Sequence, residues 1–585
     1  MQTTNSYESS SIWSRPGVDR ILVSLSARVS EHLNRASEHA GATLVAAFAL
    51  FVALAGLFQM PPIDRDEARF VQATAQMLET GDFVTIKFQD QERNKKPVGI
   101  HWLQAASVAT VSNVEARAVW AYRLPSLLGV VLAAVFTSLI GRRLFGARAG
   151  LLAGALLAAA PITAAEATFA KTDAMLLATV AGAFLALSLI LEARYGARVP
   201  KAGTRRTSWI AALGLWTAVG AGVLIKGPII VLVLATTLIT IAIVKKDIGL
   251  IGAVRPITGL AVVAAMVAPW ALAINAATDG RFFADAVGGD LLGKVGAVQE
   301  RHGGPPGYHL LLVWALLWPA TPLLFEAARK TIRERQDWRA LYLIAWAAPA
   351  WLVFELTATK LPHYTLPLYP ALALAVGAYA ARETNGSEPT IFQKAGIVVF
   401  AAIGLAMAGG MIALPALNGG GAFALTGYAV IATVFFGGVL FAALAYYRGL
   451  NQLGAISAVV CSAVFAWVYL SAALPGLAPL RLSTDVAVVV KSEAGGSAIL
   501  SGYYEPSAVF LLHGDAILAK GAAAARQVAK AVPGDRLVLS RAEKPAFDAA
   551  AEEIEFNRTL KAVTTLKGVN YSNGDALILD VYVIE

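Results

Sequence analysis

Long apolar stretches separated by short polar loops dominate the chain. A helix needs about 20 mostly apolar residues to cross ~30 Å of hydrocarbon. Thirteen stretches approach that length, at roughly 42–59, 118–140, 149–165, 173–193, 208–225, 228–245, 254–275, 308–328, 339–357, 365–381, 393–414, 424–447 and 453–474. Several are rich in alanine and glycine, which favours close helix packing in lipid. The pattern predicts a mostly α polytopic membrane protein with about 13 transmembrane helices.

Basic residues gather in alternate loops, and this sets the expected orientation. With the N-terminus inside, the cytoplasmic loops carry Arg142, Arg143, Arg148, Arg194, Arg198, Lys201, Arg205, Arg206, Lys245, Lys246, Arg255, Arg329, Lys330, Arg333, Arg335 and Arg339. The opposite loops at 166–172, 226–228 and 358–364 carry one lysine each. Cytoplasmic loops of membrane proteins are enriched in Lys and Arg. We therefore expect a cytoplasmic segment at 1–41, with an amphipathic surface helix at 18–38, and a transmembrane domain at 42–478.

The composition changes at about residue 480, where short strand and helix patterns alternate. The residues at Ser497–Ser501, Val509–Leu512, Arg536–Ser540 and Ala576–Val583 have strand character, and 519–532 and 543–555 have helical character. An odd number of spans leaves this region outside the cytoplasm. The sequence therefore predicts a periplasmic α/β domain at 479–585.

Composition supports the membrane assignment. Of 585 residues, 57% are apolar and 15% charged, whereas soluble domains are about half apolar and a quarter charged. The net charge of +9 resides in short loops, so we expect no nucleic-acid partner. Cys461, the single cysteine, lies in an apolar stretch. An intrachain disulfide and a cysteine-based metal site are excluded.

Unusual polar residues fall on the outer side of this topology. They come from six segments: Asp66, Glu67 and Arg69 in the outer loop 60–117; Lys95 and Lys96 in the same loop; Glu166, Lys171 and Asp173; Lys226; Arg301 and His302; and Lys360 with Tyr364. Ionisable groups at a membrane boundary are costly and usually mark function. We expect a shared cavity on that face.

The stretch Asp66–Thr80 is predicted to form a helix that ends at Gly81. Asp66, Arg69 and Phe70 share one face through i, i+3 and i+4 spacing. The carboxylate can act as a base, and the guanidinium offers forked donors to a phosphate. The alternative is that the acidic residues only offset the helix dipole.

Simpler structural roles also stay open for other residues of this face. Lys95 and Lys96 are alternatively interfacial anchors, and Asp173 is alternatively a structural partner of Lys171. His302 has no His or Cys at metal-ligand spacing nearby. Asp64-Arg65-Asp66 matches D-x-D, a weak motif of nucleotide-sugar enzymes. Nucleotide sugars are not supplied outside the cell, so a lipid-linked sugar phosphate is the expected donor.

Several motifs together resemble a known family. Asp66-Glu67-Ala68-Arg69-Phe70 is similar to the D-E-P-R-Y signature of bacterial membrane glycosyltransferases related to aminoarabinose transferase and protein O-mannosyltransferase. Asn94–Pro97 resembles its E-K-P-P, Lys171–Leu176 its T-D-M-L segment, and Lys226-Gly227-Pro228 its K-G-P turn. Lys360–Ala371 resembles K-L-P-x-Y-x-L-P-x-Y-P-A, and Gly502–Ser507 resembles the outer-domain signature of the aminoarabinose branch. The likeness spans about 60–585.

The resemblance implies a GT-C fold, a periplasmic active site and a polyprenyl-phosphate sugar donor of the undecaprenyl type. By position it makes Asp66, Glu67 and Asp173 the catalytic candidates. The donor phosphate is expected at Arg69, Lys96, Lys226 and Lys360, and other substrate contacts at Lys95, Arg301, His302 and Tyr364. Ala68 replaces the usual Pro, and Lys95 replaces a Glu that helps to bind a metal in some relatives. That replacement argues against a divalent metal, and no other cofactor is expected.

The sequence as a whole indicates a glycosyltransferase of the bacterial inner membrane, in contact with membrane lipid. We expect it to transfer a hexosyl or pentosyl group, with inversion, to lipid A or the lipopolysaccharide core. A protein O-glycosyltransferase that uses the same donor class is one alternative. Another is a lipid or sugar transporter or flippase, although such proteins often carry internal repeats and mid-membrane charges, which are not seen here. A non-catalytic assembly protein is the third.

Overall fold

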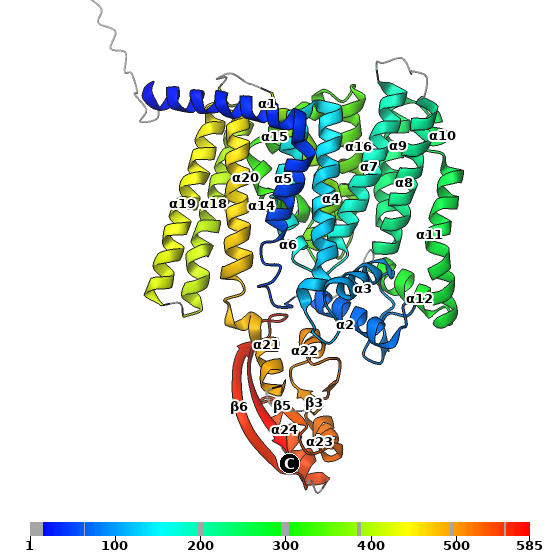
Figure 1. The fold of residues 1–585 in the computed structure, drawn as a ribbon, viewed down its shortest axis with the longest axis vertical. Helices are drawn as coiled ribbons and strands as arrows, with labels where there is room; N and C mark the ends of the chain where they lie inside the picture. The colour runs from blue at the N-terminus through cyan, green and yellow to red at the C-terminus, as the bar shows by residue number, and fades with distance from the viewer. Residues whose placement is uncertain are drawn as a thin grey trace, which may run out of the picture.

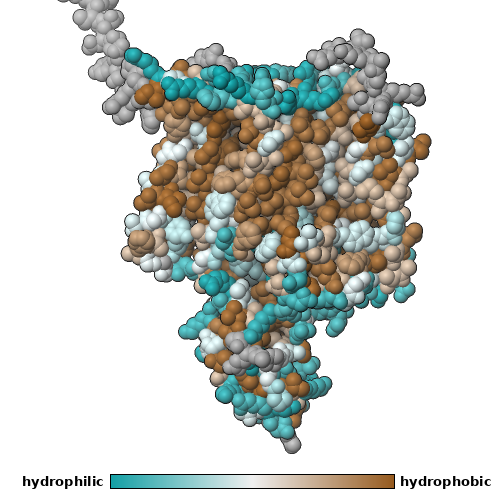
Figure 2. Space-filling model, viewed as in Figure 1, coloured by the Kyte–Doolittle hydropathy of each residue, from teal (hydrophilic) through white to brown (hydrophobic). Residues whose placement is uncertain are grey.

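The computed structural model describes residues 16–63, 65–196, 204–293, 303–382, 388–419, 421–491, 496–554 and 557–585. A bundle of long, roughly parallel helices forms the larger part of the molecule, and a smaller unit of strands and helices projects from one end (Figure 1). A broad band of apolar residues surrounds the bundle, and polar residues cover both ends (Figure 2). This distribution fits a chain that crosses a membrane.

Most of the predicted spans are single helices. Within the described residues, nine helices are long and apolar enough to cross a membrane: α1 (Pro16–Ala53), α4 (Val119–Phe145), α7 (Asp173–Tyr195), α8 (Thr204–Lys226), α11 (Pro256–Ala277), α16 (Trp338–Leu356), α18 (Ile391–Leu417), α19 (Ala422–Tyr447), and α20 (Asn451–Val468) with its extension η4 (Tyr469–Ala473). The first part of α1 runs along one edge of the bundle, as expected for a surface helix at 18–38 (Figure 1).

Proline accounts for the two bent spans. The helices α5 (Ala147–Ala158) and α6 (Pro161–Ala167) meet at 62°, and α14 (Tyr308–Leu316) meets η2 (Trp318–Ala320) and α15 (Thr321–Arg333) at 86°. Pro161 and Pro319 stand at these breaks. Proline interrupts a helix because it lacks a backbone N–H and disfavours helical conformation in the residue before it.

Two further predicted spans are short helices, α9 (Ile229–Lys245) and α17 (Tyr369–Ala380), the latter preceded by the 3-10 helix η3 (Pro362–Leu368). Each of the thirteen predicted stretches is thus mainly helical. The length and composition of the described helices support nine to eleven spans, so the number thirteen itself is not confirmed.

Close helix contact positions the start of α7, which carries a predicted site residue. A Cβ added at Gly129 of α4 would lie 2.6 Å from the carbonyl oxygen of Ala174. Only glycine permits this approach of two backbones, a common device in membrane helix packing.

The first outer loop folds into its own elements below the bundle: α2 (Arg65–Thr80), the hairpin β1 (Lys87–Phe88) and β2 (Gln91–Glu92), and α3 (Gly99–Val111) (Figure 1). The predicted helix ending at Gly81 is confirmed. Gly81 has φ +72°, the left-handed conformation that commonly terminates helices. The other short elements are α10 (Gly249–Ala253), α12 (Arg281–Phe283) and the π-helix η1 (Ala284–Leu292).

The C-terminal region is a five-stranded sheet in the order β4-β3-β5-β7-β6. Its elements are α21 (Ala478–Lys491), β3 (Ala498–Ser501), α22 (Pro506–Leu511), β4 (Ala516–Leu518), α23 (Gly521–Lys530), β5 (Arg536–Ser540), α24 (Lys544–Glu553), β6 (Leu560–Val569) and β7 (Ala576–Ile584). The strand β3 is parallel to β4 and β5, and β7 is antiparallel to β5 and β6.

Sequence prediction was right for three of these strands and for α23 and α24, but wrong for Val509–Leu512. That apolar run lies largely in α22, which begins at Pro506. Proline at the first helical position favours helix, because its φ is already helical. The strands β4 and β6 were not predicted.

The C-terminal unit contacts the outer loop directly. Gln89 Nε2 donates to the carbonyl oxygens of Gly514 (3.1 Å) and Ala516 (2.6 Å). Arg65 Nε lies 3.3 Å from Glu505 Oε2. These contacts hold the start of α2 against α22.

Candidate active site

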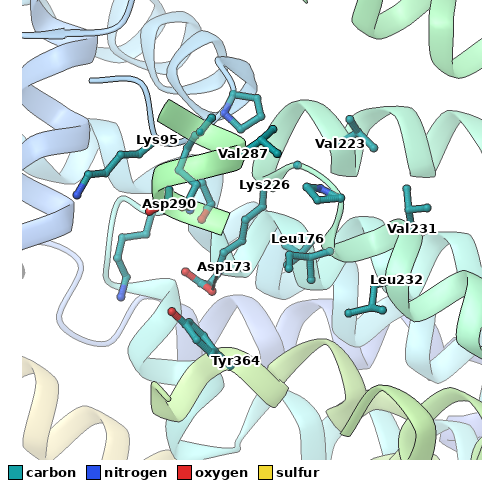
Figure 3. A pocket seen from close by; sticks show the side chains of 18 of the residues that line it. Lys95, Asp173, Leu176, Val223, Lys226, Val231, Leu232, Val287, Asp290 and Tyr364 are labelled. Carbon is teal, nitrogen blue, oxygen red and sulfur yellow. Dashed lines mark hydrogen bonds and ion pairs between the residues drawn. The ribbon is translucent and has the colours of Figure 1, made fainter. Parts of the chain in front are cut away.

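A cavity of about 620 Å³ lies where the outer loop meets the ends of the helices. Its ionisable lining residues are Asp66, Arg93, Lys95, Lys96, Lys171, Asp173, Lys226, Asp290, His363 and Tyr364. Figure 3 shows Lys95, Asp173, Lys226, Asp290 and Tyr364 on one side, and Val223, Val231 and Leu232 on the other. The cavity therefore combines a charged wall with an apolar wall.

Asp66 enters the cavity from the first turn of α2. Its Oδ1 accepts a hydrogen bond from Arg93 Nη2 at 3.0 Å and lies 3.7 Å from Arg69 Nη1. The Asp66 side chain is 56% exposed, so it remains open to a substrate. Arg69 is beside Asp66 but is not among the lining residues. Arg93, which sequence reasoning missed, lies over the Phe70 ring at 4.7 Å.

Glu67 does not join the cavity, although the sequence suggested a catalytic role. Its fully buried carboxylate accepts hydrogen bonds from Arg123 Nε (2.7 Å) and Nη2 (2.9 Å) and from the Ala170 amide (2.8 Å). The same guanidinium donates to the carbonyl oxygens of Leu57 and Met60. Successive helix residues point about 100° apart, which separates Glu67 from Asp66. This position favours a structural role for Glu67.

Asp173, Lys226 and Tyr364 do come together. Asp173 begins α7 and Lys226 ends α8, and their side chains form an ion pair. Gly227 then turns the chain with φ +71°. The Lys226 ammonium lies 6.0 Å from the centre of the Tyr364 ring, within cation–π range.

His363 extends this group and was not among the predicted site residues. Its Nε2 lies 3.8 Å from Asp173 Oδ1, and its Nδ1 lies 3.8 Å from Glu166 Oε1. Lys171 Nζ lies 3.3 Å from the same Glu166 oxygen. The residue sits at the x position of K-L-P-x-Y, so the motif gave no signal for it.

Lys95 and Lys96 both line the cavity. Lys96 Nζ lies 2.5 Å from Asp290 Oδ2, and the Asp290 side chain is 7% exposed. Lys96 is thus already in contact with an anion. Asp290 comes from η1, within a long loop without a motif, and was not predicted.

Besides Glu67 and Arg69, three further predicted residues are not placed in the cavity. Lys360 Nζ donates to the Thr357 carbonyl at 2.8 Å, and Lys360 is not among the lining residues. Arg301 and His302 lie outside the described residues.

The expectation that no divalent metal is bound came from the resembled family, in which some relatives bind one. Lys95 stands where those relatives carry Glu. Among the described residues, no group of three or more His, Cys, Asp or Glu side chains is arranged to hold a metal ion. No reaction step is therefore assigned to a metal.

Comparison with known proteins shows which proteins this chain is similar to. Residues 95–272 match the family model described as dolichyl-phosphate-mannose-protein mannosyltransferase. A relative from Yersinia pestis, undecaprenyl phosphate-alpha-4-amino-4-deoxy-L-arabinose arabinosyl transferase, is 27% identical over 387 residues, which is 64% of this chain and 67% of that protein. The Pseudomonas aeruginosa protein of that name is 27% identical over 336 residues, 55% of this chain and 57% of its own length.

Solved structures share the architecture. ArnT from Cupriavidus metallidurans, in the crystal structure bound to undecaprenyl phosphate, superposes with a TM-score of 0.72 at 18% identity and covers 92% of this chain and 97% of its own. The apo structure gives 0.70 at 19% identity, with 92% and 96% covered.

The chain therefore has the GT-C fold of membrane glycosyltransferases. The family model, the relatives and the shared fold agree in pointing to bacterial GT-C membrane glycosyltransferases of the aminoarabinose transferase and protein O-mannosyltransferase-like family as the proteins that this chain resembles. The likeness seen in the sequence motifs is confirmed.

Proposed function

We propose that this protein transfers a sugar from a polyprenyl phosphate, of the undecaprenyl type, to an acceptor at the periplasmic face of the inner membrane. The observation that carries the proposal is the cavity with one charged and one apolar wall. A polyprenyl-phosphate sugar has the same division, with a long hydrocarbon tail and an anionic phosphate. The name of the curated relatives and the undecaprenyl phosphate bound to ArnT support this donor class.

The residues suggest how the carrier would bind. Its tail would lie against apolar side chains of α8, α9 and α11, among them Val223, Leu232 and Val267. Its phosphate would be held by Lys96 and Lys226, with Arg93 and Arg69 close to Asp66. Contacts to the remote tail can supply binding energy that positions the reacting centre.

In the reaction, the bond between the anomeric carbon and the phosphate oxygen breaks, and an acceptor oxygen bonds to that carbon. Attack opposite the phosphate would invert the configuration. Asp66 would take the proton of an acceptor hydroxyl, or orient an acceptor that is already an ionised phosphate. The cations would stabilise the charge that grows on the leaving polyprenyl phosphate. Removing one such preorganised group typically costs ~10²–10³-fold in kcat.

We propose lipid A or the lipopolysaccharide core as the acceptor. The relatives act on a lipid-linked aminoarabinose donor by name, and anionic glycolipids of the outer leaflet fit a site rich in lysine and arginine. Mass spectrometry of lipid A and core from a strain without this protein would detect the missing sugar. Unchanged lipid A and core would exclude this acceptor.

The catalytic assignment is tested with Asp66→Asn in the full-length protein, supplied with a radiolabelled polyprenyl-phosphate sugar. If Asp66 acts as a base, transfer should fall by ~10²–10⁴-fold while the protein stays folded and inserted. If it only offsets the helix dipole, stability falls by ~0.3–1 kcal/mol and turnover stays near normal. Asp90→Asn is the matched control, because Asp90 is exposed in the same loop and does not line the cavity. Normal transfer by the Asp66 variant would end the assignment.

A further inference from the structure

His363 lies on the wall of the cavity, between two buried carboxylates. Its two ring nitrogens lie 3.8 Å from Glu166 Oε1 and 3.8 Å from Asp173 Oδ1. The exposed fractions of those two side chains are only 4% and 7%, whereas that of His363 is 17%. The imidazole is therefore the partly open member of a buried ionic group.

The same two oxygens also contact lysines. Lys171 Nζ lies 3.3 Å from Glu166 Oε1, and Lys226 pairs with Asp173 Oδ1. Two ammonium groups and two carboxylates cancel in charge, so the net charge of this group of five residues depends on His363. It is neutral with the neutral imidazole and +1 with the imidazolium.

The elements that pack against η3, which carries His363, contain further titratable groups. Glu166 lies on α6, Lys171 in the turn before α7, Asp173 on α7, Lys226 on α8, Tyr308 and His309 on α14, Glu355 on α16, and Tyr364 and Tyr369 beside or after His363. His309 Nδ1 lies 3.6 Å from Glu355 Oε2, so these two face each other. Tyr369 is fully buried.

We propose that His363 is a positioning residue that tunes donor binding through Asp173. The imidazolium shares Asp173 Oδ1 with Lys226, which leaves the positive charge of Lys226 available to the carrier phosphate. The neutral imidazole leaves Asp173 to neutralise Lys226. The inference rests on the proposed function, because it assumes that a phosphate binds at Lys226.

A pH dependence of donor affinity follows. An ordinary histidine titrates near 6.5. The positive charge is present below the pKa of His363 and is lost as pH rises through it, so donor binding weakens with rising pH. The donor is a phosphodiester, whose single negative charge does not change in this range. Loss of one charge ~6 Å from a phosphate, after solvent screening, is expected to raise the donor KM about tenfold.

The experiment measures donor KM and kcat for the full-length protein in lipid nanodiscs between about pH 5.5 and 8.5, around the titration range of histidine. The wild type should show a KM that rises with pH and a smaller change in kcat. His363→Gln should give a high KM without that rise. His363→Lys, which stays charged, should keep a low KM at both ends of the range.

The matched control is His32→Gln, since His32 is exposed on α1 and makes its hydrogen bond within that helix. It should reproduce the wild-type profile. If the Gln variant does not insert into the membrane, the Lys variant provides the test. Its donor KM should then not change with pH. Two results would overturn the role of His363 without affecting the proposed function. One is a wild type that transfers sugar with a donor KM that does not change with pH. The other is a Gln or Lys variant in which KM rises with pH as in the wild type. A wild type that transfers from no polyprenyl-phosphate sugar would overturn the proposed function as well.

Discussion

The Arg123 guanidinium donates two hydrogen bonds to the Glu67 carboxylate, from Nε to Oε1 at 2.7 Å and from Nη2 to Oε2 at 2.9 Å. Both side chains are almost completely buried. Arg123 also donates to carbonyl oxygens in the chain segment before α2. The pair thereby ties α2 to α4 and fixes the helix that presents Asp66.

Glu67→Gln should therefore act on stability. Breaking a buried ion pair by removing one charge typically costs ~3–5 kcal/mol. We expect a large fall in the unfolding midpoint of the detergent-solubilised protein. Glu31→Gln is the control, because its pair with Arg35 is exposed and exposed pairs contribute ~0–1 kcal/mol. Unchanged stability together with abolished transfer would restore the catalytic role expected from the sequence.

His101 provides a second stability test, with a defined direction in pH. The side chain is fully buried on α3, and its Nδ1 lies 2.8 Å from Thr74 Oγ1. Burial, helped by the charge of Arg93, lowers the pKa of His101 to about 3. In the unfolded chain the pKa is near 6.5. Between these values the unfolded state binds the extra proton, so the stabilising contribution of the neutral side chain is complete above about pH 6.5 and is lost as pH falls towards 3.

The measurement is the free energy of unfolding of wild type and His101→Gln from about pH 7.5 down to 5. The wild type should lose more stability on acidification, by at most ~1.4 kcal/mol per pH unit. His32→Gln, which changes an exposed histidine, should leave the slope of the wild type intact. Parallel curves for wild type and His101→Gln would show that His101 does not resist protonation in the fold.

The sequence predicted the elements better than it predicted the partners of individual side chains. Hydrophobic length located the helices that the described residues show to be long and apolar enough to span, because crossing lipid imposes a similar length on each. It did not separate straight helices from those bent at Pro161 and Pro319. The apolar run Val509–Leu512 has no period that distinguishes strand from helix, and so it was misassigned.

For the candidate site too, the sequence predicted which residues come together better than it predicted their individual contacts. Motifs correctly brought Asp66, Lys96, Asp173, Lys226 and Tyr364 to one cavity. Asp66 and Glu67 are adjacent in the sequence, but they point in different directions on the helix. The buried partner of Glu67 is Arg123, 56 residues away, and nothing in the sequence indicated this pairing. His363 and Asp290 come from distant segments without a distinguishing pattern, so their proximity depends on the folded bundle.

Cysteine labelling tests the orientation of the chain. Figure 1 places the surface part of α1 and the C-terminal sheet at opposite ends of the bundle. In a Cys461→Ala background, Val563→Cys on β6 should react with a membrane-impermeant thiol reagent in intact spheroplasts. Ile248→Cys, at the exposed turn before α10, should react only after the membrane is opened. Both side chains are exposed, at 46% and 84%. Reversed labelling would place the cavity on the cytoplasmic side, where nucleotide sugars become available as donors.

Lys95 tests the charge balance of the site, because it replaces the Glu of the resembled motif next to Lys96. Lys95→Glu changes the local charge by two units. A pair of charges ~6 Å apart at an effective dielectric near 20 interacts by roughly 3 kcal/mol, less where solvent screens it. Such an effect is large enough to weaken the binding of an anionic substrate. We therefore expect a higher donor KM with normal membrane insertion, and wild-type transfer that is insensitive to chelators.

The alternative for Lys95 is an anchor to lipid head groups, in which case Lys95→Gln and Lys95→Glu leave donor KM unchanged. Lys87→Glu is the control, because Lys87 is exposed on β1 in the same loop and does not line the cavity. It makes the same charge change away from the site and should not alter KM. Strong inhibition by EDTA that zinc or magnesium reverses would show that a metal is required despite the missing Glu. In that case Lys95 would not take the place of the positive charge of a metal ion. The expectation that Lys95 favours an anionic substrate would then be wrong.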